Sequence, residues 1–201
     1  MDKKKILLVD LSKGQVGELN AYLLGMILVG KILMSALSRT DIAREKRHDF
    51  YLYIDEFQNF TTDSVCSILS EARKYGLNLI IAHQYLGQLV KGQDTTIRNA
   101  VFGNVGTWLS FKIGSEDAEI IQKEYNPIFN QFDLMNIENG AAYVKLLINN
   151  SASRPFSLHT TWPITGIPRE EIASKIKSLS RLKFGQDRSI IEAEIRRRTR
   201  V

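Results

Sequence analysis

The sequence predicts an α/β fold: a mostly parallel sheet with helices on both faces and an antiparallel hairpin added late. The first observation is two apolar runs of strand length, 50–54 and 77–82, on either side of a helical pattern. A strand, helix and strand of this size form a right-handed crossover between parallel strands. The second observation is two strand-like runs, 141–148 and 156–162, which a polar loop at 149–153 joins as a hairpin.

The composition bounds the class of protein. A chain of 201 residues is long enough for one domain with a core, and 44% hydrophobic with 24% charged residues is ordinary for a soluble globular protein. The single cysteine, Cys66, excludes an intrachain disulfide and fits a reducing compartment. The three histidines lack zinc-site spacing, and no secretory signal pattern is present. We therefore expect a cytoplasmic protein.

Positive charge is concentrated in the last part of the sequence. Residues 169–201 contain 10 Lys and Arg against 5 Asp and Glu, whereas the other 168 residues contain 17 of each kind. The stretch 163–168 is typical of a linker, so we expect a first domain at 1–165 and a helical basic tail at 166–201. Such a tail binds nucleic acid or anionic lipid, or it is simply a solvated helix face.

Before the crossover, we expect a strand at 6–11, a turn at 12–15 and a long apolar helix at 17–39. Within that helix, residues 19–37 carry a single charge, Lys31, and are nearly long enough to cross a membrane. Its glycines would also suit a helix that packs on a sheet. The sequence favours a buried helix, with a membrane span as the alternative.

The crossover helix is expected to begin at a Thr61 or Thr62 cap and to end at Gly76, where a left-handed residue is wanted. The downstream patterns predict, in order, a short helix at 85–90, a helix at 95–103, a strand at 107–113, a helix at 116–125 capped by Ser115, a short helix at 129–137, and two tail helices that begin at Pro168 and near Ile190.

Two adjacent acids, Asp55 and Glu56, stand at the carboxyl end of the first crossover strand, and Gln84 stands just past the second. Ligands of open α/β sheets bind beyond the carboxyl ends of the strands. The first acid can hold a hydrated Mg²⁺, and the second can orient or deprotonate an attacking water. Gln84 could bond to that water or to a γ-phosphate. The alternative is that the acidic pair is a solvated turn.

The segments YLYIDEFQNF and SEARKYGLNLIIAHQYLGQL carry a resemblance to a known family. They look like the second half of the motor domain of the FtsK/HerA superfamily of P-loop ATPases. Within it, they are most similar to the TraG/TraD-like coupling proteins of conjugation and type IV secretion, which have a TraM-recognition domain. The resemblance runs from about residue 6 to about residue 162 and implies a RecA-like sheet.

The resemblance also implies roles for individual residues. Asp55 and Glu56 match the Walker B pair, in which Asp55 binds Mg²⁺ and the nucleotide and Glu56 is the catalytic acid, and Gln84 matches the sensor glutamine. Arg73 matches an arginine that reaches the nucleotide of a neighbouring subunit; alternatively, it complements the dipole of its helix. Lys13 lies in a loop near the ATP-binding region and is either a phosphate ligand or an exposed turn lysine.

By the same resemblance, we expect an ATP-driven DNA pump that uses Mg²⁺, forms a hexameric ring around DNA, and works with a relaxase or accessory protein at the cytoplasmic face of the inner membrane. The sequence departs from the family in having no G-x-x-x-x-G-K-[ST] loop for the phosphates. We therefore expect the carboxy-terminal part of a motor, inactive by itself. The alternatives are a HerA-type pump for DNA repair or segregation, and a non-catalytic module that binds DNA or an accessory protein.

Overall fold

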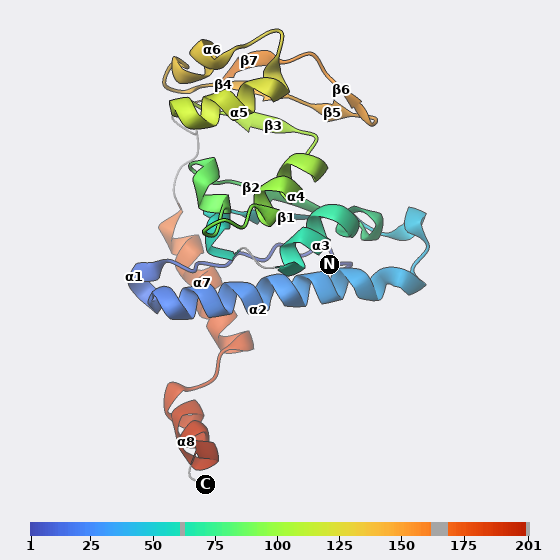
Figure 1. Cartoon of the computed structure of the whole chain (residues 1–201). Coiled ribbons are helices and arrows are strands. Elements are labelled where there is room, and N and C mark those ends of the chain that lie inside the picture. The colour runs from blue at the N-terminus through green and yellow to red at the C-terminus, as the bar shows by residue number, and fades with distance from the viewer. Residues whose placement is uncertain (61–62, 162–168, 200–201) are drawn as a thin grey trace. The chain divides into compact units, whose positions relative to one another are not determined.

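The chain consists of two units, Met1–Thr160 and Thr161–Val201, and each is described by itself. The structure is a computed structural model that describes residues 1–60, 63–161 and 169–199. Within the described residues, all the strands belong to the first unit, and the second unit is helical (Figure 1).

A parallel pair of strands forms the centre of the first unit. β1, Phe50–Ile54, and β2, Leu77–Ile81, pair in register along their full length. The crossover between them consists of α3, Asp63–Glu71, and the 3₁₀ turn η4, Ala72–Tyr75. Gly76 ends the turn with φ of 71°, in the left-handed region that favours glycine. The predicted crossover and its glycine terminator are therefore confirmed. The helical pattern of apolar residues at 65, 68, 69 and 72 predicts an inward face for the crossover, and Val65, Ile68 and Ala72 of this set are buried.

The prediction of a strand at 6–11 is wrong. The segment forms no strand, and Ile6 is 88% exposed and Leu8 85% exposed. A strand requires a ladder partner, and β1 has only β2 as its partner among the described residues. The α/β class is confirmed, but the mostly parallel sheet is not, because β1 and β2 are the one parallel pair in the described part of the chain.

A separate antiparallel sheet follows in the order β3, Trp108–Ser110, β4, Ala141–Lys145, and β7, Phe156–His159. The chain between β4 and β7 forms a two-stranded extension from β5, Leu147–Ile148, and β6, Ser151–Ala152. The two asparagines between β5 and β6 have positive φ, which asparagine adopts more readily than most residues. The predicted late hairpin is confirmed, although its strands are shorter and more divided than the sequence pattern indicates.

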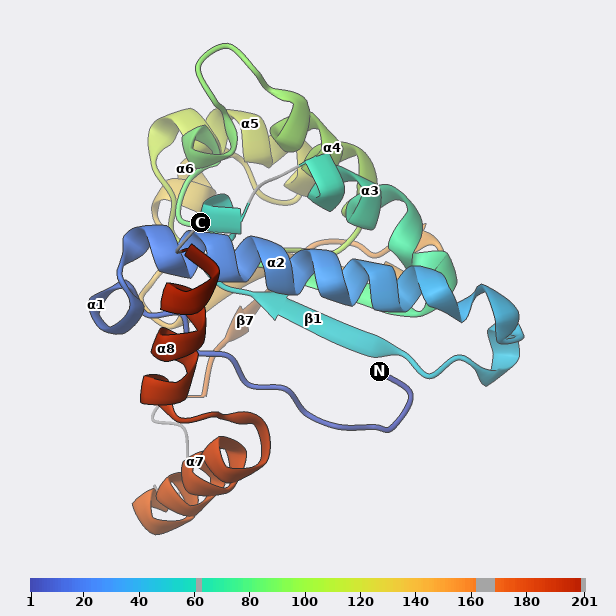
Figure 2. The same cartoon turned by 90° about the horizontal axis from the view of Figure 1, so that it is seen from below.

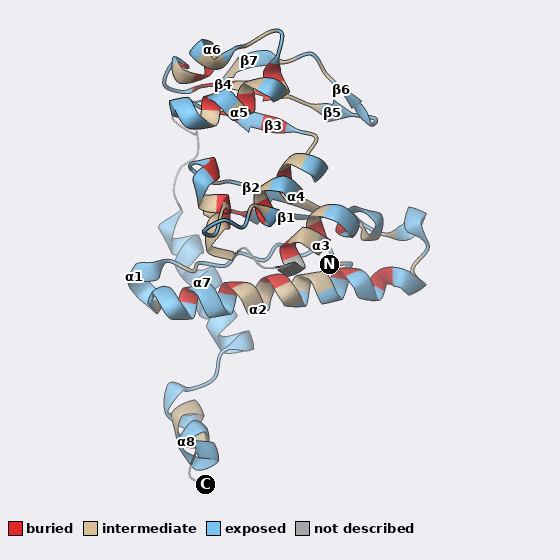
Figure 3. Ribbon diagram, viewed as in Figure 1, coloured by how far each residue is buried: buried red, intermediate tan, exposed pale blue. Residues whose placement is uncertain are grey.

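The long helix α2, Glu18–Leu37, runs beside β1 in Figure 2. A Cβ on its Gly25 would lie 2.0 Å from the ring of Phe60, so the helix approaches the turn after β1 as closely as glycine allows. Most of the helix is nevertheless exposed, and the prediction of a buried helix is wrong for all but one face (Figure 3). Over Glu18–Asp41 it is long and apolar enough to cross a membrane, a test that core helices also pass.

The remaining helices of the first unit are short. Those after β2 lie close to their predicted positions, whereas α1 forms where a turn was predicted and the 3₁₀ turns before α3 were not predicted. The predicted Ser115 cap is wrong, because Gly114 occupies the N-cap and makes no side-chain bond. Asn130 provides a cap that the sequence reasoning missed, accepting bonds from the backbone N–H of Phe132 and Asp133. These helices are α1, Lys13–Val16; η1, Ser38–Asp41; η2, Arg44–Lys46; η3, Phe57–Phe60; η5, Leu86–Leu89; α4, Thr96–Asn104; α5, Ser115–Tyr125; and α6, Gln131–Met135.

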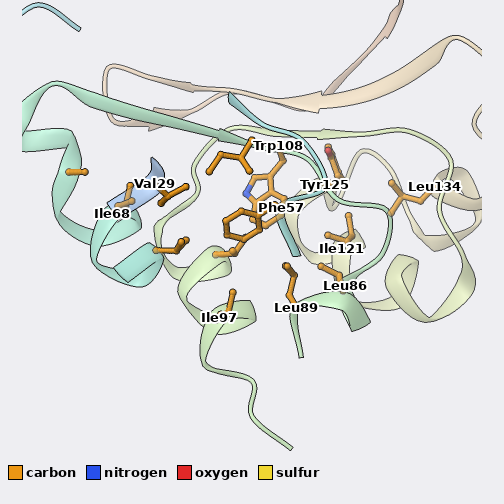
Figure 4. Close-up of a cluster of buried hydrophobic side chains, with 14 of the residues drawn as sticks. Val29, Phe57, Ile68, Leu86, Leu89, Ile97, Trp108, Ile121, Tyr125 and Leu134 are labelled. Carbon is orange, nitrogen blue, oxygen red and sulfur yellow. The ribbon is translucent and has the colours of Figure 1, made fainter. Parts of the chain in front are cut away.

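One hydrophobic core joins the crossover to the segments that follow it. Phe57, directly after the acidic pair, is fully buried and points into the same cluster as Trp108 and Val29 (Figure 4). Because the side chain of Phe57 is buried in this core, it holds the adjacent turn that carries Asp55 and Glu56 in place.

The second unit contains α7, Glu170–Phe184, and α8, Arg188–Thr199, as predicted from their patterns. Pairs of opposite charge four residues apart line both helices, including Lys175 with Glu171 and Arg188 with Glu192. The expected caps at 61 and 62, the linker at 163–168 and the start of the tail helix at Pro168 lie outside the described residues.

Candidate functional site at the carboxyl ends of β1 and β2

The structure brings Glu56 and Gln84 together at the carboxyl ends of the parallel strands. The ladder between the strands continues past their ends, from Ala82 N–H to Ile54 O at 3.0 Å and from Phe57 N–H to Ala82 O at 2.9 Å. These two bonds hold the segments that follow β1 and β2 side by side. Gln84 Nε2 then donates to Glu56 Oε1 at 2.9 Å. The sequence predicts Gln84 just past the second strand, as a partner of the attacking water or of a γ-phosphate; the structure places its amide directly on Glu56.

Glu56 is held in an uncommon conformation and is ionised. Its φ is +48°, in the left-handed region, and such outliers in non-glycine residues cluster at functional sites. Its second carboxylate oxygen accepts a bond from Gln58 Nε2 at 2.5 Å. The amide donors of Gln84 and Gln58 hold the pKa of the Glu56 carboxyl below its usual value, with a smaller contribution from the charge of Lys13. The carboxylate is therefore charged and oriented at neutral pH.

Asp55 presents a carboxylate to solvent beside this pair. One of its oxygens accepts a bond from the backbone N–H of Glu56 at 2.9 Å, and the residue is exposed. Mg²⁺ is usually held by one or two carboxylates together with waters and substrate phosphates, so Asp55 fits that mode of binding. The described residues contain no group of three or more His, Cys, Asp or Glu side chains that could form a cage made by the protein alone.

Two residues that sequence reasoning missed hold Gln84 in place. Gln88 Oε1 accepts bonds from the backbone N–H of Gln84 and of Tyr85, at 3.1 and 3.3 Å. Asp117 Oδ2 accepts from Leu86 N–H at 2.9 Å. Gln88 stands three residues after the N-cap Tyr85, which is the spacing of a capping box and a signal the sequence does carry. Asp117 gives no such local signal, because it comes from α5.

Lys13 lies on the same side of the molecule as the acids. It lines, with Asp55 and Glu56, a groove of about 1800 Å³ between the amino-terminal segment, α2 and β1. Its Nζ is paired with Glu18 at 2.8 Å, and the lysine side chain is 53% exposed. The lysine is thus close enough to influence Glu56, but its charge is shared with a second acid.

Arg73 lies at the other end of the strands. It belongs to η4, directly before β2, and its Nη2 donates to Asn150 Oδ1 at 3.2 Å. Because β1 and β2 are parallel and five residues long, the turn before β2 is separated from the turn after it by about 16 Å at 3.3 Å per residue. Within one subunit, Arg73 and Glu56 do not form one site.

Comparisons with known proteins indicate a family likeness for part of the chain. Residues 49–123 match the family model described as the TraM recognition site of TraD and TraG. No curated protein sequence matches the chain significantly. Among solved structures, the fold is similar to the bacterial conjugative coupling protein TrwBdeltaN70 in its unbound monoclinic form, with a TM-score of 0.55 and 15% sequence identity over 67% of this chain. The chain covers 36% of the length of that protein. It resembles the carboxy-terminal part of TraG/TraD-like coupling proteins.

Proposed function

We propose that this chain is the carboxy-terminal part of an ATP-driven DNA-translocating motor, the coupling ATPase of conjugative DNA transfer or type IV secretion. The observation that carries the proposal is the bond between Gln84 and Glu56, which joins an ionised acid to an amide at the ends of two parallel strands. The match of residues 49–123 to a model of TraD and TraG supports the conjugative setting. In that setting, the motor works at the cytoplasmic face of the inner membrane.

The residues divide the work of hydrolysis between them. The ionised carboxylate of Glu56 accepts a hydrogen bond from the attacking water and orients it, and Gln84 fixes the carboxylate in place. Asp55 is the residue to hold Mg²⁺, which when bound would neutralise phosphate charge. Lys13 can add a positive charge on the rim of the same groove. The phosphate-binding loop must come from outside these residues, because the sequence contains none.

Arg73 acts, in this proposal, on the nucleotide of a neighbouring subunit. Its position at the amino end of β2 separates it from its own Glu56 by about a strand length, so it can meet an acid pair only in another copy. A ring brings such opposite faces of successive subunits together, and arginines supplied in trans stabilise the charge of the transition state.

The second candidate is recognition of an accessory protein by residues 49–123. The family model is described by its recognition of TraM, and β1 exposes Tyr51 and Tyr53, at 57% and 72%, on one side of the strand. Aromatic side chains of this kind are enriched in protein interfaces. This role is compatible with the first, since a coupling motor must receive its cargo. A HerA-type pump would use the same catalytic residues, but it lacks the support of the TraD and TraG match.

The test of the motor proposal is Glu56→Gln in a protein that contains this chain together with a phosphate-binding loop. The amide keeps the shape of the side chain but cannot accept a proton. We expect ATP turnover to fall by about 10²–10⁴-fold while nucleotide binding remains. The 201-residue chain alone should bind Mg-ATP weakly in a calorimetric titration. Near-normal turnover of the variant, or submicromolar binding by the chain alone, would contradict the proposal.

A further inference from the structure

A second pocket, of about 370 Å³, lies at the amino ends of β1 and β2. It is separate from the turn that carries Asp55 and Glu56, because the amino ends and the carboxyl ends of parallel strands lie at opposite ends of the sheet. Four of its lining side chains are cationic and one is anionic, which leaves a net charge of +3 by 4 − 1. The lining residues are Arg44, Arg47, Asp49, Arg73, Lys74, Gly76 and Asn78.

Arginine bonds to backbone carbonyls hold the floor of this pocket in place. Arg47 donates from Nε to Ile42 O and from Nη1 to Lys74 O, each at 2.7 Å. Arg39, which is only 1% exposed, donates from Nη1 to Tyr75 O at 2.9 Å. These bonds attach the connection after α2 to the turn that carries Arg73 and Lys74. The pocket is therefore built before any ligand arrives, which lowers the entropy cost of binding.

The positive charge of the pocket is only partly neutralised inside the chain. Asp49 accepts a bond from Asn78 Nδ2 at 3.2 Å, and Lys74 pairs with Glu71 at 3.0 Å. Arg47 donates to carbonyls, which are neutral. Among the described residues, the guanidinium of Arg44 has no hydrogen-bond or ion-pair partner, and Arg73 uses one N–H for Asn150. Two guanidinium groups with free donors thus line one small, preformed pocket.

We propose that this pocket binds a phosphate group, with Arg44 and Arg73 as its direct ligands and Arg47 and Lys74 supplying further positive charge. Guanidinium groups match phosphate oxygens with pairs of N–H donors, which lysine cannot do. The phosphate can belong to a free or nucleotide polyphosphate, or to a nucleic-acid backbone. The site shares Arg73 with the proposed function but needs neither a second subunit nor hydrolysis, so it can be tested apart from that function.

The experiment is a calorimetric titration of the full 201-residue chain with pyrophosphate at low ionic strength and without Mg²⁺. Arg44→Gln and Arg73→Gln should each weaken binding about tenfold or more, because each removes charge-assisted hydrogen bonds to the phosphate. Arg44→Lys keeps the charge but not the paired donors, so it should recover only part of the affinity. Both substituted residues are exposed, and circular dichroism checks that the variants fold.

The matched control is Lys112→Gln, which removes one exposed positive charge outside both sites. It should leave pyrophosphate affinity unchanged, because Lys112 does not line the pocket. Equal losses in Arg44→Gln and Lys112→Gln would mean that only net charge matters and would overturn the site. Absence of binding by the unsubstituted chain would overturn it as well.

Competition by a short single-stranded DNA separates the two sources of phosphate. If the DNA displaces pyrophosphate from the unsubstituted chain, but does not displace the pyrophosphate that the Arg44→Gln variant still binds, the pocket takes the nucleic-acid backbone. If the DNA leaves pyrophosphate bound, the pocket takes free or nucleotide phosphates. Failure of this site would leave the Glu56 experiment untouched, and failure of the Glu56 experiment would leave pyrophosphate binding as it is.

Discussion

The two ends of the β1–β2 pair carry opposite charge. The carboxyl end presents Asp55 and Glu56 with the amide of Gln84, and the amino end presents the guanidinium groups of Arg44 and Arg73. A strand length of about 16 Å lies between them. An acid that activates water and an arginine that stabilises phosphate charge must be within a few ångströms of the same phosphate. One copy of this chain therefore cannot supply both groups to one nucleotide.

The two ends are also built from different interactions. At the carboxyl end, the strand ladder and neutral amides fix the acid, and the backbone of Glu56 is strained at φ +48°. At the amino end, Arg39 and Arg47 fix the turn through backbone carbonyls. Substitutions at the carboxyl end should therefore change chemistry with little effect on folding, whereas those beneath the amino end should change stability first.

The largest effect is expected from Arg73→Ala in a motor that contains this chain and a phosphate-binding loop. Loss of an arginine supplied in trans should lower ATP turnover by about 10³–10⁵-fold. Mixing this variant with Glu56→Gln should restore part of the activity, because some boundaries then pair an intact acid with an intact arginine. If Arg73→Ala alone keeps its turnover and only loses some stability, Arg73 complements the helix dipole instead, which is worth about 0.3–1 kcal/mol.

A smaller effect is expected from Arg39→Met, which tests how the amino end is held. The methionine fills the buried space but leaves Tyr75 O without its donor, at a cost of about 1–3 kcal/mol in the free energy of unfolding. Chemical denaturation measures this loss, and hydrogen exchange should place it at the amides of η4 and β2. Asp2→Asn is the control, since it removes only the charge of the half-exposed partner of Arg39 and leaves the bond to Tyr75 O in place; it should cost less than Arg39→Met. Equal costs would show that the ion pair, not the carbonyl bond, holds the turn.

Deletion of residues 169–201 asks whether the basic tail or the basic pocket binds DNA. The tail carries the whole excess of positive charge, 10 − 5 = 5, while the remaining residues balance at 17 of each sign. We expect the deletion to remove most of the salt dependence of DNA binding, at a slope of about 0.9 per lost phosphate contact on duplex DNA. A shortened chain that binds with the same slope would assign DNA to the pocket of Arg44 and Arg73 instead.

The crossover, and the placement of Glu56 and Gln84 at the same end of the parallel pair, could be predicted from the sequence because both depend on local patterns. The parallel pair is defined by two apolar runs, a helical repeat between them and Gly76. Paired parallel strands place their carboxyl ends next to each other, independently of the rest of the fold. The strand at 6–11 could not be judged in the same way. An apolar run forms a strand only where the edge of a sheet offers backbone groups to pair with. Local propensity does not reveal whether such an edge is available to residues 6–11.

The amino-end pocket was out of reach for a different reason. Arg39, Arg44 and Arg47 belong to a charged connection without periodicity, and their partners at 74 and 75 are backbone carbonyls. A carbonyl carries no sequence identity, so no pattern of residue types indicates which arginine it will receive. Asp117 in α5, which accepts from Leu86 N–H, was hidden for the same reason. Long-range bonds from side chain to backbone become visible only in the folded chain.

The smallest effect concerns the pKa of Glu56 and compares how much each neighbouring side chain lowers it. Amide donors favour the charged carboxylate, so the pKa of Glu56 lies below its usual value, with Gln84 as the largest cause of the lowering, Gln58 next and Lys13 last. Gln84→Leu should therefore raise that pKa more than Gln58→Leu, and Lys13→Gln should raise it least. Carboxyl ¹³C NMR titration of the 201-residue chain measures each midpoint.

The sign also fixes where this acid contributes to stability. Because the folded pKa is the lower one, the contribution is fully present above the unfolded pKa and is lost as the pH falls through the folded pKa. In Gln84→Leu, the folded pKa of Glu56 moves closer to its unfolded pKa. The pH range over which this contribution to stability is lost therefore becomes narrower. A larger rise in Lys13→Gln than in Gln84→Leu would mean that the charge across the groove, and not the amide on the neighbouring strand, sets the state of Glu56. The carboxyl end would then depend on α1 instead of on the parallel pair.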